Sequence, residues 1–372
     1  PNGGFAPTLV ITTDANNNDV VGPTELGAAT TFSVKVTFNS TLVKVGDKIV
    51  FSDGTTVTLT GPQASSGSFT QTFAKPAEGA ALTISAHLDS PLGASTEESD
   101  EDTATLDTTP PNNNVAPTIE ITTDTNNDGF VNTAELNGST TFTVKASFNN
   151  DFVVAGDSMV LSDGTTTTTV VLTAADVANG FVTTTFSKPA TEGGTLSVTA
   201  KLTDKGGNNT PTSTADTAKL DTTAPNGGNP VVLTIDLDTG NDGIINAAEK
   251  GVATTTSLTA TFDKLLVGVG DTITFSDGTT TKVVTLTATD IAAGQVTSTG
   301  WALPAEGQTL HVTALLADAA GNTVPVATDS ALLDTLVPPV PTVSITTDAD
   351  NNGFVNAAEI GALTKVTVTG TF

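Results

Sequence analysis

The chain has 372 residues, enough for about three domains of ordinary size. Its 40 acidic and 13 basic residues give a formal net charge of -27. This charge excludes nucleic acid as a partner and disfavours anionic membrane surfaces, because phosphate groups would be repelled. The same charge favours multivalent cations, which would relieve the repulsion between carboxylates.

The composition is typical of β-sheet proteins with small hydrophobic cores. Val, Leu, Ile, Ala, Phe and Thr dominate, and cysteine is absent, so disulfides and thiolate metal sites are excluded. No apolar run reaches the length of a membrane span, so direct membrane insertion is not expected. The chain opens on Pro1 without a visible leader peptide, and we interpret it as an internal fragment of a longer protein.

Internal repetition dominates the sequence. Four segments align without gaps at spacings of 110, 114 and 110 residues: ITTDANNNDVVGPTEL, ITTDTNNDGFVNTAEL, IDLDTGNDGIINAAEK and ITTDADNNGFVNAAEI. A Gly-Asp pair, a Ser-Asp-Gly-Thr turn and a closing Leu-Asp-Thr recur in step with them, and linkers rich in Pro, Asn and Gly follow. We predict three repeats at residues 1–113, 114–227 and 228–338, and a partial fourth repeat at 339–372.

One repeat is predicted to contain seven strands. In the second repeat they span residues 118–123, 140–148, 158–161, 167–172, 181–186, 195–202 and 214–220, with one helical turn near 174–180. Runs such as TFTVKASF alternate apolar and polar positions, as half-buried strands do. Seven short strands in about 110 residues predict an all-β, immunoglobulin-like sandwich, and we expect such domains in tandem to form an elongated rod.

The second aligned segment matches a twelve-residue calcium loop in full. Calcium prefers six to eight oxygen ligands, and this spacing supplies them from one continuous segment. The side chains of Asp124, Asn126 and Asp128 would bind directly, and Glu135 could bind with both oxygens. Phe130 would offer its main-chain carbonyl, and Asn132 holds the position that often acts through water.

The other copies vary around this pattern. The fourth copy matches in full, with Asp348, Asp350, Asn352, Phe354, Asn356 and Glu359. The third copy keeps Asp238, Asp242, Ile244, Asn246 and Glu249 but has glycine at its third position. The first copy has Asp14, Asn16, Asn18 and Glu25, with Asp19 in place of the usual glycine. We expect the first copy to be the weakest or most distorted, and we expect strands, rather than amphipathic helices, on both flanks.

A second acidic set is predicted at the junctions between repeats. In such a sandwich, the first loop and the end of the last strand share one pole, and the loop before the last strand lies at the other. Calcium could therefore be held between Asp107 and Asp204, or between Asp221 and Asp318. Asp334 closes the third repeat in the same way as Asp107 and Asp221 close the first two.

Catalytic motifs are not found, and we expect no enzyme activity. The sequence contains no Ser/His/Asp grouping and no phosphate-binding loop. The acidic residues 97–102 lie in a Ser-containing loop that is typical of solvated charge. His87 and His311 lie in strand-like runs and are expected to be ordinary strand side chains.

These motifs together resemble the bacterial immunoglobulin-like extender repeats of giant RTX-type adhesins exported by type I secretion. The resemblance covers essentially the whole chain and rests on the repeat length, the acidic loop, the TDxxGN-type motif at Asp204 and Asp318, and the closing LDTTAP. It implies an extracellular, cell-surface protein of Gram-negative origin, rigidity that depends on calcium, and a spacer role in biofilm or host attachment. Its partners would be neighbouring repeats of the same chain.

Two other functions remain open at this point. One repeat could recognise a glycan or a surface protein through its variable loops, for which the acidic loop at 97–102 is the best candidate. Alternatively, the chain could assemble with copies of itself into a filament or surface layer, and a neighbour would then complete the partial fourth repeat.

Overall fold

The computed structural model describes residues 1–372 and divides into two compact units, Pro1–Thr222 and Thr223–Phe372. Three separate hydrophobic clusters lie between residues 11 and 106, 121 and 220, and 231 and 333. The protein is nearly all β, so the predicted all-β sandwich is confirmed. None of its helices is long or apolar enough to span a membrane.

The second repeat is built from two sheets. The first has the order β10-β12-β15, with β10 at Thr118–Ile121, β12 at Thr141–Ser147 and β15 at Phe181–Ser187. The second has the order β11-β17-β16-β13-β14, with β11 at Phe130–Val131, β17 at Asp216–Leu220, β16 at Thr195–Thr203, β13 at Ser158–Ser162 and β14 at Thr167–Val171. Short helices are η2 (Asn112–Asn114), α3 (Thr133–Leu136), η3 (Asn150–Phe152) and α4 (Ala174–Asn179).

All seven strands predicted for this repeat are present, and α4 lies where a helical turn was expected. The sequence pattern did not indicate the eighth strand, β11, which pairs in parallel with β17 through Phe130 and Lys219. Two residues are too few to show an alternation of apolar and polar positions. The segment between β10 and β11 therefore carries the chain from one sheet of the sandwich to the other.

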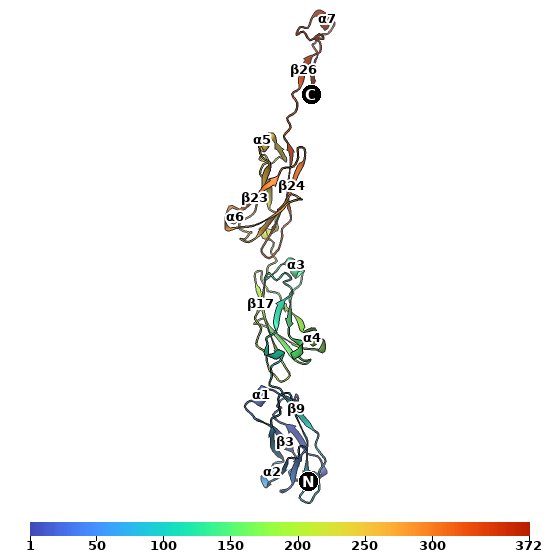
Figure 1. Cartoon of the computed structure of the whole chain (residues 1–372), viewed down its shortest axis with the longest axis vertical. Helices are drawn as coiled ribbons and strands as arrows, with labels where there is room; N and C mark the ends of the chain where they lie inside the picture. The colour runs from blue at the N-terminus through green and yellow to red at the C-terminus, as the bar shows by residue number, and fades with distance from the viewer. The chain divides into compact units, whose positions relative to one another are not determined.

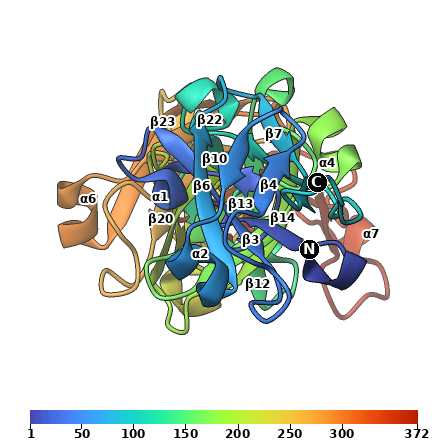
Figure 2. The ribbon, with the colours of Figure 1, turned by 90° about the horizontal axis from the view of Figure 1, so that it is seen from below.

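The first repeat, drawn in blue to cyan in Figures 1 and 2, has the same plan with one interruption. One sheet joins β1 (Thr8–Ile11), β3 (Thr31–Thr37) and β6 (Ser68–Ala74), and β3 and β6 lie side by side in Figure 2. The others are β2-β9-β7 and β5-β4-β8, with β2 at Val20–Val21, β9 at Asp102–Leu106, β7 at Ala81–Ile84, β5 at Thr56–Thr58, β4 at Lys48–Phe51 and β8 at Ala86–Asp89. Its helices are η1 (Asn2–Gly4), α1 (Pro23–Leu26) and α2 (Gly61–Ser66). Ser85 divides the strand that is continuous as β16 in the second repeat.

The third repeat belongs to the other unit. Its sheets are β18-β20-β23 and β19-β25-β24-β21-β22. Their bounds are β18 Val232–Ile235, β19 Ile244–Asn246, β20 Thr255–Thr261, β21 Thr272–Ser276, β22 Thr281–Thr285, β23 Gln295–Ala302, β24 Thr309–Ala317 and β25 Ala327–Asp334. The helices are η4 (Pro225–Gly228), α5 (Ala247–Lys250) and α6 (Ala288–Ala293).

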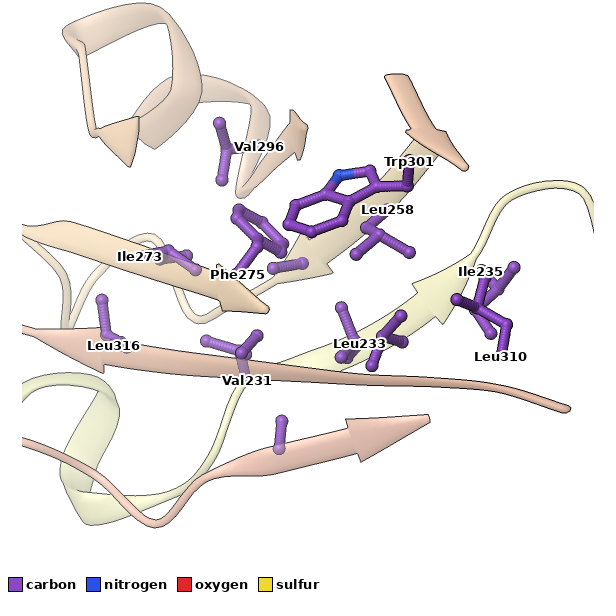
Figure 3. Packing of buried hydrophobic residues seen from close by; sticks show 14 of the residues in the cluster. Val231, Leu233, Ile235, Leu258, Ile273, Phe275, Val296, Trp301, Leu310 and Leu316 are labelled. Carbon is purple, nitrogen blue, oxygen red and sulfur yellow. The ribbon is translucent and has the colours of Figure 1, made fainter. Parts of the chain in front are cut away.

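Trp301 is the largest side chain in the core of the third repeat (Figure 3). The indole is 1% exposed, and its N–H donates to the Ser298 carbonyl oxygen at 3.1 Å and the Ser298 hydroxyl at 3.2 Å. Burying a large aromatic ring contributes on the order of 3 kcal/mol. Because Trp301 is the only tryptophan of the chain, its fluorescence reports on this core alone.

The fourth aligned segment forms β26 (Thr342–Ile345), α7 (Ala357–Ile360) and β27 (Val368–Thr371). The two strands pair in antiparallel register from Thr342 with Thr371 to Ile345 with Val368. Both strands are exposed over their whole length. A single two-stranded pair has no opposing sheet against which to bury apolar side chains.

Candidate functional site: four acidic loops and a carboxylate cluster

The four aligned segments share one hydrogen-bonding pattern, which we call the loop frame (residues 14–25, 124–135, 238–249 and 348–359). In every copy, the first aspartate accepts main-chain N–H groups from the fifth and sixth loop residues at 2.8–3.1 Å. In every copy, one oxygen of the final glutamate accepts an N–H from the second or third residue, and the other accepts the N–H of the ninth. The frame draws the carboxylates at both ends of the loop toward its centre.

The chain direction in the frame depends on two positions with positive φ. The fourth residue is asparagine in all copies, with φ between 48° and 55°: Asn17, Asn127, Asn241 and Asn351. Asparagine tolerates this left-handed conformation better than other non-glycine residues. The sixth residue also has positive φ, which glycine adopts without strain in three copies.

The second loop shows the electrostatic consequence of the frame. Asp124 is 5% exposed, and burial raises the pKa of its carboxyl group; the charges of Asp128 and Glu135 raise it further, against hydrogen bonds from Gly129 and Asp128. The Asn126 amide donates to Asp128 at 2.9 Å. The carboxylates of Asp124, Asp128 and Glu135 therefore lie close enough for their charges to repel, and a divalent cation would relieve this repulsion.

The fourth loop brings three carboxylates closest together. One oxygen from each of Asp348, Asp350 and Glu359 lies within 4.8 Å of the others. Partial desolvation and the neighbouring Asp348 and Glu359 raise the pKa of Asp350. An all-oxygen cluster of this kind fits a hard cation such as Ca²⁺ better than a transition metal.

The third loop keeps the frame although it lacks a side chain at its third position. A β-carbon built on Gly240 would lie 3.7 Å from Asp242 Oδ2 and from Glu249 Oε1. A side chain at this position would therefore point toward both carboxylates. This copy therefore lacks one side-chain oxygen that the other copies have, while its backbone hydrogen bonds are retained.

The first loop is not distorted, contrary to one of the two expectations for this copy. Asp19 takes φ 66° at the position where the other copies have glycine, and its N–H still donates to Asp14 at 2.8 Å. The hydrogen bonds of the frame outweigh the strain of an aspartate in this region, which is on the order of 1–2 kcal/mol. Having Asp19 in place of glycine therefore costs conformational energy but leaves the backbone of the loop unchanged.

The expected strands lie on both flanks, such as β10 and β12 around the second loop, but one helical turn precedes each downstream strand. One helical turn, such as α3 at Thr133–Leu136, contains the final glutamate in every copy. Asn132, Asn246 and Asn356 cap these turns, and each accepts two N–H groups through its side-chain oxygen. In the structure these residues therefore act as helix caps, and they form a capping box with the glutamate.

The main-chain carbonyl of the seventh loop residue lies between two carbonyls that pair with the neighbouring strand. The carbonyls of Gly129 and Val131 both accept N–H groups from the segment at β17, from Lys219 and Asp221. Successive carbonyls of a strand point in opposite directions, so the Phe130 carbonyl points away from β17. The corresponding residues in the other copies are Val20, Ile244 and Phe354.

A separate carboxylate cluster joins the first and second repeats within the unit Pro1–Thr222. The Asn208 amide donates to the Asp107 carbonyl oxygen at 3.0 Å and to its carboxylate at 3.3 Å, and also to Asp204 at 2.9 Å. Asp157, which is 2% exposed, lies close enough to both aspartates for their charges to interact. The three carboxylates line a cleft of about 390 Å³ together with the linker residues Thr109, Pro110, Pro111 and Asn113.

The pKa values of all three carboxyl groups in this cluster are raised. For Asp107 the cause is burial, with Asp204 and then Glu78 adding to it. For Asp157 the cause is burial and the charge of Asp107, and for Asp204 it is burial and the charge of Asp157, opposed by hydrogen bonds from Asn208. No basic side chain compensates these charges in the cleft lining.

The first acidic loop also touches the second repeat. Asn18 donates to the Lys205 carbonyl at 3.1 Å. A β-carbon built on Gly22 would lie only 1.7 Å from the Gly206 carbonyl oxygen. Glycine at the ninth position of the first loop therefore permits a main-chain approach that the asparagine of the other copies would block.

The remaining sequence-predicted aspartates are placed as follows. Asp318 accepts the N–H groups of Ala320 and Asn322 at 3.0 and 2.8 Å, and its charge raises the pKa of the buried Asp271 beyond the effect of burial. The N–H of Asp221 donates to Val131, and the Asp334 carboxylate accepts the N–H of Leu336 at 3.3 Å. A metal between Asp221 and Asp318 remains a prediction.

No protein-family model and no curated protein matches the chain. Among solved structures, the chain is similar to one from work on the host cell surface retention of a 1.5-MDa bacterial ice-binding adhesin. The two share 21% identity over 89% of this chain and 98% of the other, with a TM-score of 0.33. It is also similar to a Ca²⁺-stabilized adhesin that helps an Antarctic bacterium reach out and bind ice (24% identity, 93% and 78%, TM-score 0.35). A third is a tetra-tandem repeat in the extending region of a large adhesion protein (19% identity, 91% and 76%, TM-score 0.27).

Sequence reasoning missed the carboxylate Asp157, although the recurring Gly-Asp pair was a usable signal. Asp47, Asp157 and Asp271 are all buried, and each accepts an N–H from a residue three positions earlier. The first repeat lacks the opposing aspartate, because Ser90 occupies the place of Asp204 and Asp318 in the same turn.

The structure also assigns roles to recurring residues outside the acidic loops. Asn2, Asn112 and Asn226 are buried at positive φ, and each accepts an N–H from the residue 37 positions later at 2.8 Å. Asp102, Asp216 and Asp329 each accept the N–H of the isoleucine that ends the first strand. Glu78, Glu192 and Glu306 accept hydrogen bonds from the threonine after the closing aspartate.

Proposed function

We propose that the chain is a calcium-stiffened spacer segment of a large extracellular adhesin, which holds a distal binding domain away from the cell surface during biofilm formation or host attachment. The observation that carries the proposal is the loop frame, which recurs four times and in its fourth copy brings three carboxylates within 4.8 Å of one another. Each complete frame connects the two sheets of one sandwich. A cation bound there would tie both sheets together at one pole.

Calcium is the cation that these residues fit. In the second loop, the oxygens of Asp124, Asn126, Asp128 and Glu135 and the carbonyl of Phe130 would hold it, and equivalent residues serve the other copies. Bound Ca²⁺ supplies charge neutralisation and fixes the ligands relative to one another. Extracellular modules of this kind commonly bind Ca²⁺ at about 10⁻⁴–10⁻³ M, so the chain would remain soft at low calcium and stiffen outside the cell.

The cluster of Asp107, Asp157 and Asp204 extends the proposal to the junction of the first two repeats. Three partly buried carboxylates with raised pKa values and no basic partner favour a bound cation. An ion at this place would fix one repeat against the next through residues from both. The chain would then act as a non-enzymatic spacer in an RTX-type adhesin exported by type I secretion.

Small-angle scattering and thermal unfolding, with millimolar CaCl₂ and then with excess EGTA, test the proposal. We expect EGTA to shorten the maximum dimension and lower the unfolding midpoint. The Glu135→Gln and Glu359→Gln variants should lose part of the calcium effect, whereas Glu120→Gln, on an exposed face of β10, should keep it. The proposal fails if neither dimension nor midpoint responds to EGTA.

A further inference from the structure

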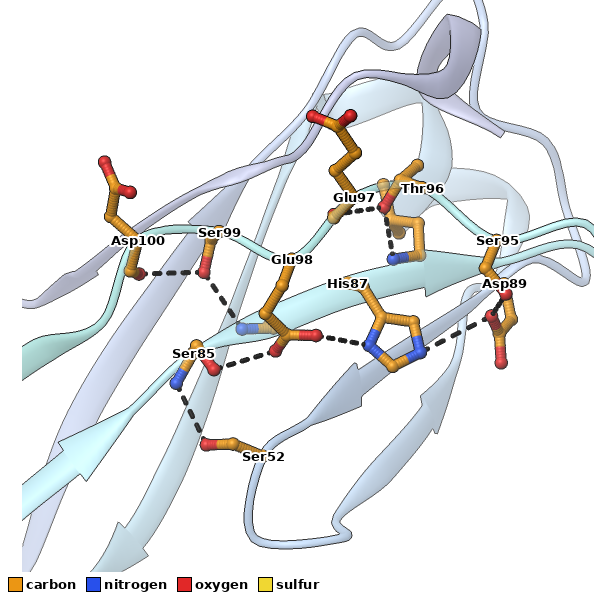
Figure 4. A network of polar contacts seen from close by, with 12 residues as sticks. Ser52, Ser85, His87, Asp89, Ser95, Thr96, Glu97, Glu98, Ser99 and Asp100 are labelled. Atoms are coloured by element: carbon orange, nitrogen blue, oxygen red, sulfur yellow. Dashed lines mark hydrogen bonds and ion pairs between the residues drawn. The ribbon is translucent and has the colours of Figure 1, made fainter.

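His87 lies between two carboxylates in the first repeat (Figure 4). Its Nδ1 is 2.8 Å from Glu98 Oε2, and its Nε2 is 3.5 Å from Asp89 Oδ1. The other oxygen of Glu98 accepts the Ser85 hydroxyl at 2.7 Å, and Asp89 Oδ1 accepts the Ser95 hydroxyl at 2.5 Å. Both carboxylates are therefore held in place by neighbours other than the histidine.

The two sides of the imidazole ring differ in distance. The Nδ1 contact is an ordinary hydrogen bond, in which the ring N–H donates to Glu98. The Nε2 to Asp89 separation of 3.5 Å is longer than a good hydrogen bond. With only Nδ1 protonated, the lone pair of Nε2 faces an anionic oxygen, an arrangement that a metal ion or a second proton between the two atoms would relieve.

A transition-metal ion fits this gap. Zinc binds imidazole nitrogen and carboxylate oxygen at about 2.0–2.2 Å, and two such ligands at a tetrahedral angle lie about 3.4 Å apart. A metal-binding histidine commonly donates its other N–H to a carboxylate, which fixes the ring and its tautomer. Glu98 already occupies that orienting position.

We propose that His87 Nε2 and Asp89 form a two-residue site for Zn²⁺ or a similar transition metal, that Glu98 is a positioning residue, and that water completes the coordination. The His87 and Asp89 side chains are 27% and 33% exposed, which leaves the ion accessible to solvent. A nitrogen ligand separates this site from the all-oxygen loops, because imidazole favours Zn²⁺, Ni²⁺ or Cu²⁺ over Ca²⁺.

The second repeat supplies an internal comparison on the same backbone. Main-chain N–H groups donate to Thr96 and Ser99 in the first repeat and to Thr210 and Ser213 in the second, so the two loops align without a gap. This alignment places Lys201, Thr203 and Thr212 where the first repeat has His87, Asp89 and Glu98. The same scaffold therefore folds without the three groups of the site, which are peculiar to the first repeat.

Imidazole ¹⁵N NMR of the uniformly labelled full chain tests the proposal. The chain has two histidines, and His311 serves as the internal reference, assigned with a His311→Gln variant. ZnCl₂ is added at fixed pH to protein kept in excess CaCl₂, so that the carboxylate loops do not compete. We expect the Nε2 resonance of His87 to shift and saturate at one equivalent, while His311 remains unchanged.

Variants separate a metal site from a simple ion pair. Asp89→Thr and His87→Lys introduce the residues of the second repeat, and circular dichroism verifies that they are folded. We expect Asp89→Thr to weaken Zn²⁺ binding at least tenfold, His87→Lys to abolish the one-equivalent step, and Glu98→Gln, which keeps an acceptor for Nδ1, to weaken it less than Glu98→Ala. An unchanged His87 signal, equal shifts at both histidines, or full affinity in Asp89→Thr would overturn the proposal.

Discussion

The side-chain amide of Asn208 donates to both the main-chain carbonyl and the carboxylate of Asp107, 101 residues earlier in the chain. These hydrogen bonds connect the turn before the last strand of the second repeat to the end of the last strand of the first. They are partly buried, and the same amide also holds Asp204. Asn208 therefore fixes two of the three carboxylates in the cluster with Asp157.

Replacing Asn208 with alanine should loosen this junction. The change removes hydrogen bonds to charged acceptors, which contribute about 1.5–3 kcal/mol each when partly buried. We expect amide hydrogen exchange in linker residues 108–117 to accelerate roughly tenfold or more. Asn209→Ala is the matched control, because Asn209 bonds to Thr203 and Gly207 within its own repeat; equal acceleration in both variants would contradict the role of Asn208.

Replacing Gly240 with asparagine should strengthen the third acidic loop. The new side chain would point toward Asp242 and Glu249 and restore the missing oxygen ligand, and Gly240 does not need positive φ. We expect the calcium concentration that half-stabilises the third repeat to fall several-fold, as followed by Trp301 fluorescence during thermal unfolding. Gly268→Ala, outside the loop, controls for a general effect of removing glycine, and an unchanged calcium response would show that position 3 is not a ligand position.

Replacing Asn226 should destabilise the third repeat in two ways, through lost hydrogen bonds and through backbone strain, and two variants can separate them. Asn226→Gly keeps the backbone conformation at φ 53° but loses hydrogen bonds to Asp263 and Asn229, at a cost of about 1–3 kcal/mol. Asn226→Ala adds left-handed strain of about 1 kcal/mol. Urea unfolding followed by Trp301 fluorescence should rank the variants in that order. Asn112→Ala makes the same change in the second repeat and should leave the Trp301 transition in place.

Acid should weaken the third repeat partly through Asp277. Partial burial raises the pKa of the Asp277 carboxyl group, but hydrogen bonds from Thr280 and Thr279 outweigh burial and lower this pKa below its ordinary value. Because the folded pKa is lowered, this stabilisation is complete above the unfolded pKa of about 3.9 and is lost as pH falls below it. Solvent screening limits the effect to less than about 1 kcal/mol.

Unfolding free energies of the wild type and Asp277→Asn, measured with Trp301 fluorescence between pH 5 and pH 2, check this expectation. The variant should show a shallower pH dependence. In the equivalent turn of the second repeat, hydrogen bonds from Thr166 and Thr165 lower the pKa of Asp163 to about 2. Asp163→Asn is therefore the matched control, because Trp301 fluorescence does not report on the second repeat. Identical pH profiles for the wild type and Asp277→Asn would contradict the assignment.

The sequence by itself determined the repeat, the strands and the acidic loops. Alternating apolar and polar residues specify strands such as β12 locally, and the recurrence of Asp and Glu at fixed spacing marks the loops, because both signals act over a few neighbouring residues. The asparagines with positive φ in the loops were also within reach of local reasoning, since Asn127 and its equivalents recur in all four copies.

Only the tertiary structure decided which distant groups meet. It added β11, which exists because β17 offers it a parallel partner, and it placed the buried Asp157 beside Asp107 and Asp204. It also brought Glu98, from the segment between β8 and β9, onto His87, which shares one face of β8 with Asp89. Such contacts depend on how separate strands and turns pack, and no spacing along the chain encodes that packing.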